Sequence, residues 1–148
     1  MKVLEVLNSQ RVDLTLEATT KESTIQKMAE MFFEDGLLHD KDAFIESVLE
    51  REIHSTTGVG NGIAIPHGKS AAVKEPAIAF ARLEKTVEWQ SLDDKPVSMV
   101  VMLAIPDSQQ GETHLSILSE IAVKLMDDEL VEKLQTATSE EEIVKILG

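Results

Sequence analysis

Residues 97–105, Val97-Ser98-Met99-Val100-Val101-Met102-Leu103-Ala104-Ile105, form the stretch that decides the fold of this 148-residue chain. The stretch is apolar apart from Ser98 and is closed by Pro106. A continuous apolar run of this kind is typical of a central strand that is buried on both faces of its sheet. Such a strand needs cover on both sides, so the stretch predicts helices on both faces of the sheet.

Two more strand-like segments come before this stretch, and helical patterns lie on either side of the strand block. The segments are residues 63–65 and residues 76–83, in which Ile78 and Phe80 alternate with other residues. No linker rich in Ser, Gly or Pro and no internal repeat divides the chain. We therefore expect a single α/β domain over residues 1–148, with a mixed central sheet flanked by helices on both faces.

Two helices are predicted before the strands. Thr19 and Glu22 form a capping box that predicts the start of the first, and Gly36 is placed to end it. The second is expected to begin after Asp40, with Arg51 near its end and away from its apolar face. The expected apolar faces are Ile25, Met28, Ala29 and Phe32 in the first helix and Phe44, Ile45, Val48, Leu49 and Ile53 in the second.

Three helices are predicted after the strands. They are expected to begin near Gly111, near Asp127 or Asp128, and at a capping box of Thr138 and Glu141. Their expected inner faces are Leu115, Leu118, Ala122 and Leu125, then Leu130, Val131 and Leu134, then Ile143, Ile146 and Leu147.

The composition limits both the partners and the chemistry. Acidic residues outnumber basic ones by 27 to 14, which argues against nucleic acid because a phosphate backbone needs clustered Lys and Arg. The absence of cysteine excludes disulfides and thiolate nucleophiles. No run approaches the roughly 20 apolar residues of a membrane span, and no signal peptide is visible. We expect a cytoplasmic protein that is not inserted into a membrane.

Spacing excludes several familiar motifs. Five residues separate Gly62 from the Gly-Lys-Ser that begins at Gly68, one more than a phosphate-binding P-loop allows. The glycines at positions 58–62 lack the preceding strand and following helix of a dinucleotide fingerprint. GxSxG, HExxH and EF-hand patterns are absent, so we expect no metal and no cofactor.

The chain has four histidines, and their settings differ. His39 lies in a predicted loop and His54 at the end of a predicted helix, where surface roles suffice. His67 follows strand-like residues through Pro66 and precedes Gly68, in a predicted turn at the end of a strand, where sites in open sheets form. A turn that only faces water is the open alternative.

Residues 52–68, EIHSTTGVGNGIAIPHG, resemble the signature of type-2 EIIA domains of the sugar phosphotransferase system. The resemblance consists of an acidic residue at 52, an aliphatic residue and a glycine at 59 and 60, and IAIPHG at 63–68. It continues in Arg51 upstream and in the ETHL stretch after Pro106 downstream. The length suits one free-standing EIIA domain.

The resemblance implies a phosphoryl carrier. In the family, the histidine of the PHG motif accepts a phosphoryl group from phosphorylated HPr and gives it to a cysteine of a IIB component for coupled sugar uptake and phosphorylation. His67 takes this role here, through Nε2, and the chain's lack of cysteine requires a separate IIB protein. Arg51 stabilises the phosphoryl charge, and His114, on the first turn of a predicted helix, donates a hydrogen bond to a phosphoryl oxygen. A shallow apolar patch around His67 is expected for transient docking.

Simpler interpretations of the two helper residues remain open. Arg51 also fits a solvated helix residue paired with Glu46 or Glu50. His114 also fits a helix start without a ligand.

The function within the family has alternatives too. Residues 73–79 and 89–93 look more like the fructose-type subgroup than the mannitol type. The TGVGNGIAIPHGK stretch also fits nitrogen-related EIIA proteins, which signal by their phosphorylation state through protein binding. A buried and fully bonded His67 ring would favour a purely structural domain. Neither the sugar nor the oligomeric state follows from the sequence.

Overall fold

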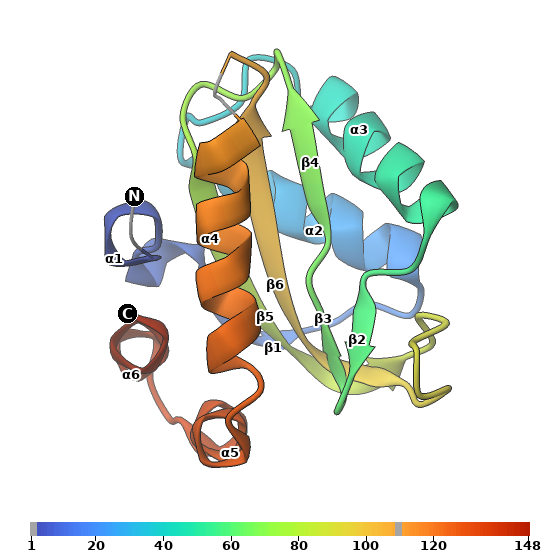
Figure 1. The fold of residues 1–148 in the computed structure, drawn as a ribbon, viewed down its shortest axis with the longest axis vertical. Helices are drawn as coiled ribbons and strands as arrows, with labels where there is room; N and C mark the ends of the chain where they lie inside the picture. Colours follow the sequence, from blue (N-terminus) through green and yellow to red (C-terminus); the bar gives the residue numbers. More distant parts are fainter. Residues whose placement is uncertain (1–2, 109–110) are drawn as a thin grey trace.

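Strand β6 (Val97–Pro106) is the centre of the sheet, as the sequence predicts (Figure 1). The computed structural model describes residues 3–108 and 111–148, and leaves out the side chains of residues 111–115. Every described residue of β6 except Ser98 is buried. Both faces of this strand are therefore covered.

The sheet is mixed, which confirms the predicted fold class. β6 runs antiparallel to β5 and parallel to β3 and β4, while β1 runs parallel to β5 and β2 antiparallel to β3. The order across the sheet is β1 (Val12–Leu16), β5 (Ala77–Val87), β6, β3 (Ile63–Ala64) and β2 (Gly58–Gly60), and β4 (His67–Ser70) pairs with β6 further along the edge that β3 begins.

Helices cover both faces of the sheet (Figure 1). None of the helices in the described part of the chain is long and apolar enough to cross a membrane. One face is covered by α2 (Lys21–Glu34) and α3 (Lys41–His54), and the other by α4 (Gly111–Lys124) together with α1 (Val3–Val6), the short η1 (Ser9–Arg11), α5 (Asp128–Thr136) and α6 (Glu140–Leu147).

The alternation of side chains along β6 builds two cores. Val100 and Met102 pack on the side of α2 and α3, where Phe32 and Phe44 meet edge to face with ring centroids 5.7 Å apart. The intervening residues, Leu103 among them, pack on the side of α4. Because successive strand side chains point to opposite faces, one apolar stretch serves both cores.

The helix starts follow the predicted cap types, with two shifts of one residue. α2 is capped by Thr20 with Ser23, one position after the predicted pair of Thr19 and Glu22. α6 is likewise capped by Ser139 and not by Thr138. In each case two adjacent hydroxyl residues could cap, and the one with an extended backbone at the helix start does so. The predicted starts after Asp40 and Asp127 are confirmed.

The predicted apolar faces are correct in most helices and wrong at two places. Ile53 is 82% exposed, because the last turn of α3 carries it away from the core. The predicted inner face of α4 is confirmed at Leu118 and Leu125 and wrong at Ala122, which is exposed. Ile117 and Ile121 complete the buried face, as a helix with apolar residues on several faces permits, and the side chain of Leu115 lies outside the described residues.

The glycine-rich stretch before β3 contains strand β2 followed by a turn. Gly58 lies so close to residue 91 that a Cβ atom there would be 2.4 Å from Ser91 Oγ. The turn itself falls on Asn61 and Gly62, both with positive φ. Gly58 is therefore needed for close strand contact and Gly62 for the turn.

Candidate functional site

His67 begins strand β4, on the edge of the sheet. It pairs in parallel with Leu103 of β6, and the predicted Pro-His-Gly turn is wrong because the chain stays extended through Ser70. Pro66 has no N–H to give to the ladder, so it separates β3 from β4 without ending the extended path. The Pro66 carbonyl still accepts a bond from Leu103 N at 3.0 Å.

Gly68 fixes which way the His67 side chain points. A Cβ atom at Gly68 would lie 2.4 Å from Ser47 Oγ and 2.8 Å from a Val48 methyl carbon, so α3 packs directly on the backbone of β4. Neighbouring side chains on a strand point to opposite faces. His67 therefore lies on the other face, where its partner Leu103 joins the core beside α4.

The His67 ring is held in one orientation. It is 8% exposed, and its Nδ1 lies 3.0 Å from the Ile65 carbonyl oxygen. A carbonyl can only accept, so Nδ1 carries the proton of the neutral ring and Nε2 carries the lone pair. The geometry therefore selects the tautomer in which Nε2 is the nucleophilic nitrogen.

Burial lowers the pKa of His67 below its usual 6.5. The Ile65 carbonyl and the charge of Glu52 act against this, while the positive charge of Arg51 adds to it. The net lowering keeps the ring neutral near pH 7. A neutral ring is the form that can attack an electrophile.

Arg51 lies in the last turn of α3, close enough for its charge to act on His67. Its Nη1 donates to the Ser55 carbonyl at 2.9 Å and to Ser55 Oγ at 3.3 Å. These contacts hold the guanidinium at the end of the helix instead of in the predicted alternative pairing with Glu46 or Glu50. The structure thus places the positive charge of Arg51 within electrostatic range of the His67 ring.

His114 is placed by its backbone alone. That backbone lies in the first turn of α4, as predicted. The side chain of His114 is outside the described residues. Its contact with a phosphoryl group stays a prediction.

In the sequence Glu52 is only the first residue of the matched signature, whereas the structure gives its side chain several partners. Its side chain is 6% exposed and accepts bonds from Thr57 N at 3.3 Å, from Thr57 Oγ1 and from Lys21 Nζ at 3.2 Å. Trp89 Nε1 donates to Thr57 Oγ1 at 3.2 Å. The acidic start of the signature was the one signal that pointed to this cluster.

An apolar surface lies beside the site. A cavity of about 220 Å³ is bounded by Ile65, whose carbonyl holds His67, and by Val59 and Met126, which are 48% and 80% exposed. The rest of its lining comes from the β2–β3 turn and the C-terminal end of α4, namely Gly60, Asn61, Ala122 and Leu125.

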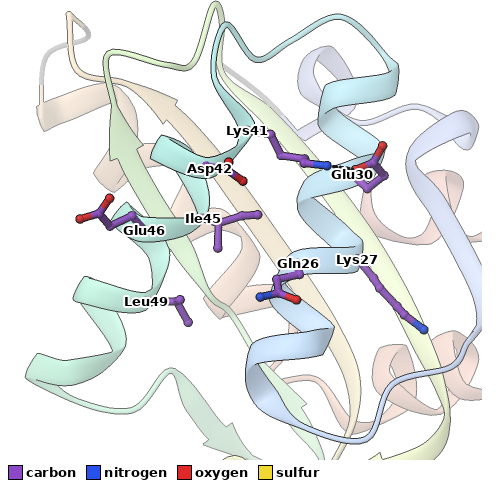
Figure 2. A pocket seen from close by; sticks show the side chains of 8 residues that line it. All are labelled: Gln26, Lys27, Glu30, Lys41, Asp42, Ile45, Glu46 and Leu49. Atoms are coloured by element: carbon purple, nitrogen blue, oxygen red, sulfur yellow. Dashed lines mark hydrogen bonds and ion pairs between the residues drawn. The ribbon is translucent and has the colours of Figure 1, made fainter.

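A larger cavity of about 560 Å³ lies between α2 and α3 and does not belong to this site (Figure 2). Figure 2 shows Lys41 reaching across to Glu30, with an N–O distance of 2.5 Å, above the apolar side chains of Ile45 and Leu49. This cavity lies on the α3 side of β4, which is the side that Gly68 faces, whereas the His67 side chain points to the opposite side. No cluster of three potential metal-ligating side chains occurs within residues 3–108 and 116–148.

Comparisons of the sequence with known proteins point to one family. A profile of the family described as "Phosphoenolpyruvate-dependent sugar phosphotransferase system, EIIA 2" matches residues 5–148. The fructose-specific EIIA component of Haloferax volcanii is 38% identical over 137 residues, which cover 93% of this chain and 88% of the relative. The fructose-specific EIIABC component of Bacillus subtilis is 40% identical over 148 residues, and the chain spans 23% of its length.

Regulatory relatives are nearly as similar. The nitrogen regulatory protein of Klebsiella oxytoca is 32% identical over 148 residues, covering 99% of this chain and 90% of the relative. The crystal structure of nitrogen regulatory protein IIA-Ntr from Neisseria meningitidis superposes with a TM-score of 0.91 at 32% identity, over 99% of both chains. IIA mannitol from Escherichia coli shares the fold, with a TM-score of 0.80 at 24% identity over 96% of this chain and 99% of that one.

Proposed function

Because the chain belongs to the EIIA type 2 family of the phosphoenolpyruvate-dependent sugar phosphotransferase system, we propose that it is a phosphoryl carrier and that His67 carries the group. The phosphoryl group comes from phosphorylated HPr and goes to a IIB component, with residues 1–148 acting as one carrier domain. The observation that carries this proposal is the bond from His67 Nδ1 to the Ile65 carbonyl, which makes Nε2 the nucleophilic nitrogen of a buried ring.

The transfer step follows from that geometry. The Nε2 lone pair attacks phosphorus while the bond from phosphorus to the donor breaks, and no proton has to leave Nε2. Nδ1 keeps its proton and its bond to the Ile65 carbonyl, which favours the positive charge that the phosphorylated ring acquires. Phosphoryl transfer requires little covalent work from the protein beyond positioning and charge compensation. We assign charge compensation to Arg51 and a further hydrogen bond to His114.

The apolar surface around Val59 and Met126 fits the docking of both partner proteins in turn. His67 is nearly buried, so a donor or acceptor atom must be brought to it by a protein surface that closes over the edge of β4. Exposed apolar side chains beside a catalytic residue favour such contacts, and a small patch keeps them transient.

Within the family, we propose a fructose-type transport role. The fructose-specific relatives are 38% and 40% identical to the chain, against 32% for the nitrogen regulatory protein of Klebsiella oxytoca. The second candidate, regulation through the phosphorylation state, is favoured by the TM-score of 0.91 with IIA-Ntr. Both candidates use the same phosphorylated histidine. They differ in whether the phosphoryl group passes on to a IIB component or the phosphorylation state is reported to another protein by binding.

Transfer of labelled phosphate from phosphorylated HPr tests the proposal. We expect the wild-type chain and the matched control His39→Gln to be labelled and His67→Gln to remain unlabelled. Equal labelling of His67→Gln would overturn the proposal, and a structural role for the buried ring would gain support if the wild-type chain took no label. Onward transfer to a fructose-type IIB protein is expected for a transporter, and its absence would favour the regulatory candidate.

A further inference from the structure

We propose that Glu52 is a positioning residue for His67, acting through Thr57 and the backbone of Ile65. The inference rests on the proposed role of His67 as the phosphoryl acceptor. It concerns a buried polar cluster that links the end of α3 to the segment between β2 and β4.

The first link joins Glu52 to Thr57. The carboxylate accepts from both the backbone N–H and the hydroxyl of Thr57, so the two residues are joined twice. Lys21 Nζ forms an ion pair with Glu52 Oε2 at 3.2 Å. A carboxylate is an acceptor only, so both bonds run from Thr57 to Glu52.

The second link joins Thr57 to the His67 ring. The Thr57 carbonyl accepts from Ile65 N at 3.0 Å, and the Ile65 carbonyl lies 3.0 Å from His67 Nδ1. The side chain of Thr57 is thus held by α3, and its main chain holds the residue that orients the ring. Movement of Thr57 would shift the Ile65 carbonyl and rotate the ring away from its productive orientation.

Trp89 closes the cluster from the other side. Its side chain is fully buried, and its Nε1 donates to Thr57 Oγ1, while Thr56 Oγ1 donates to the Trp89 carbonyl at 3.1 Å. The Thr57 hydroxyl has one proton, which it gives to Glu52, and it accepts the indole N–H. Both directions are therefore fixed, and the cluster has one arrangement of its hydrogen bonds.

Charge gives Glu52 a second effect on the same ring. Its negative charge raises the pKa of His67, against the lowering by Arg51 one residue earlier. A carboxylate near the ring favours the positive charge that an imidazole acquires when Nε2 is phosphorylated. Positioning and charge therefore act in the same direction.

The experiment compares Thr57→Val, Thr57→Ser and Glu52→Gln in the whole chain. Glu50→Gln is the control, because Glu50 is exposed on the same helix. Two readouts are taken: the rate of label transfer from phosphorylated HPr, and the NMR signals and titration of the His67 ring nitrogens. The ring signals need no phosphoryl donor.

We expect Thr57→Val to slow transfer by about ten- to a hundredfold, as misplacement of a reacting group does, and to change the ring-nitrogen signals. Thr57→Ser keeps the hydroxyl and should restore both readouts. Glu52→Gln keeps an acceptor oxygen but loses the charge, so it should lower the His67 pKa and slow transfer less. Glu50→Gln should match the wild type.

A folded Thr57→Val chain with wild-type transfer and unchanged ring signals would overturn the inference. If Thr57→Val does not fold, an unchanged rate and titration in Glu52→Gln would overturn it instead. Failure of the wild-type chain to take label would sink the carrier proposal alone. Changed ring signals in Thr57→Val would still support the positioning of His67 by this cluster.

Discussion

The Ile65 carbonyl oxygen and His67 Nδ1 lie 3.0 Å apart, two residues along one chain and on either side of a proline. Pro66 has no N–H and a restricted φ, so it keeps the backbone between them extended and free of a competing donor. The contact ties the tautomer of the ring to the path of its own strand. The chemistry of His67 is therefore set by local backbone geometry before any partner arrives.

The lowered pKa of His67 predicts a pH dependence of stability. Between the folded-state pKa and the unfolded value of 6.5, the unfolded chain binds more protons than the folded chain. The contribution of His67 to the free energy of unfolding is therefore full above pH 6.5 and is lost as the pH falls from 6.5 through the folded-state pKa. Urea unfolding of the wild type and of His67→Gln across this range should show a flatter profile for the variant, with His39→Gln as control. Titration of His67 above pH 6.5 by NMR would contradict the prediction.

Gly68→Ala should destabilise the fold and slow phosphoryl transfer. The added Cβ would meet Ser47 Oγ at 2.4 Å and the Val48 methyl carbon at 2.8 Å, which forces α3 away from β4. Overpacking of this kind costs about 1–3 kcal/mol of unfolding free energy. Denaturant titration measures the loss, and addition of Ser47→Ala should recover part of it because one of the two clashes is removed. An unchanged denaturant midpoint for Gly68→Ala would contradict this prediction, because α3 could then move away from β4 without loss of stability.

The sequence predicts the parts of this fold whose patterns are long. The apolar stretch of β6 predicts the central strand, its cover on both faces and the class, and the 3.6-residue patterns of α2 and α3 predict one of the two helical layers. Strand β1 is absent from the predicted elements although Val12, Leu14 and Leu16 alternate with Asp13 and Thr15, a pattern only five residues long. The short strands β2 and β4 carry too few residues for a period of two, and β2 contains two glycines. The extended state of β2 and β4 depends on tertiary pairing with β3 and β6, which no local propensity encodes.

The candidate site, like the fold, is predicted from the sequence only in part. The resemblance points to His67 and Arg51 by their positions in and beside a signature, and the structure places the charge of Arg51 within electrostatic range of the His67 ring. Trp89 lies far from Thr57 in the chain and outside the signature, so its bond to Thr57, which in turn donates to Glu52, follows only from the fold. The direction of the His67 side chain likewise required knowledge that α3 packs against Gly68.

Arg51→Gln should slow phosphoryl transfer strongly while it disturbs the fold little. The substitution removes a positive charge that lowers the His67 pKa, so that pKa should rise. Loss of one charge-compensating donor in a transition state costs about 10²–10³-fold in rate. Arg51→Lys keeps the charge but not the forked geometry of the guanidinium, so its transfer rate should lie between those of the wild type and Arg51→Gln. Single-turnover labelling by phosphorylated HPr measures the rates, and a wild-type rate for Arg51→Gln would remove Arg51 from the transfer step.

Met126→Glu should weaken partner docking and leave the chemistry intact. Met126 is 80% exposed beside the cavity that Ile65 borders, so the substitution should change the unfolding free energy by no more than about 0.5 kcal/mol. A charge in an apolar contact has to be desolvated when the partner arrives, which raises the KM for phosphorylated HPr by about tenfold. Because the ring of His67 is untouched, kcat should stay near the wild-type value. The matched control is Phe33→Glu, since Phe33 is 45% exposed on α2, across the sheet from this surface, and its KM should not change. An unaltered KM for Met126→Glu, or an equal rise for Phe33→Glu, would place the docking surface elsewhere on the molecule.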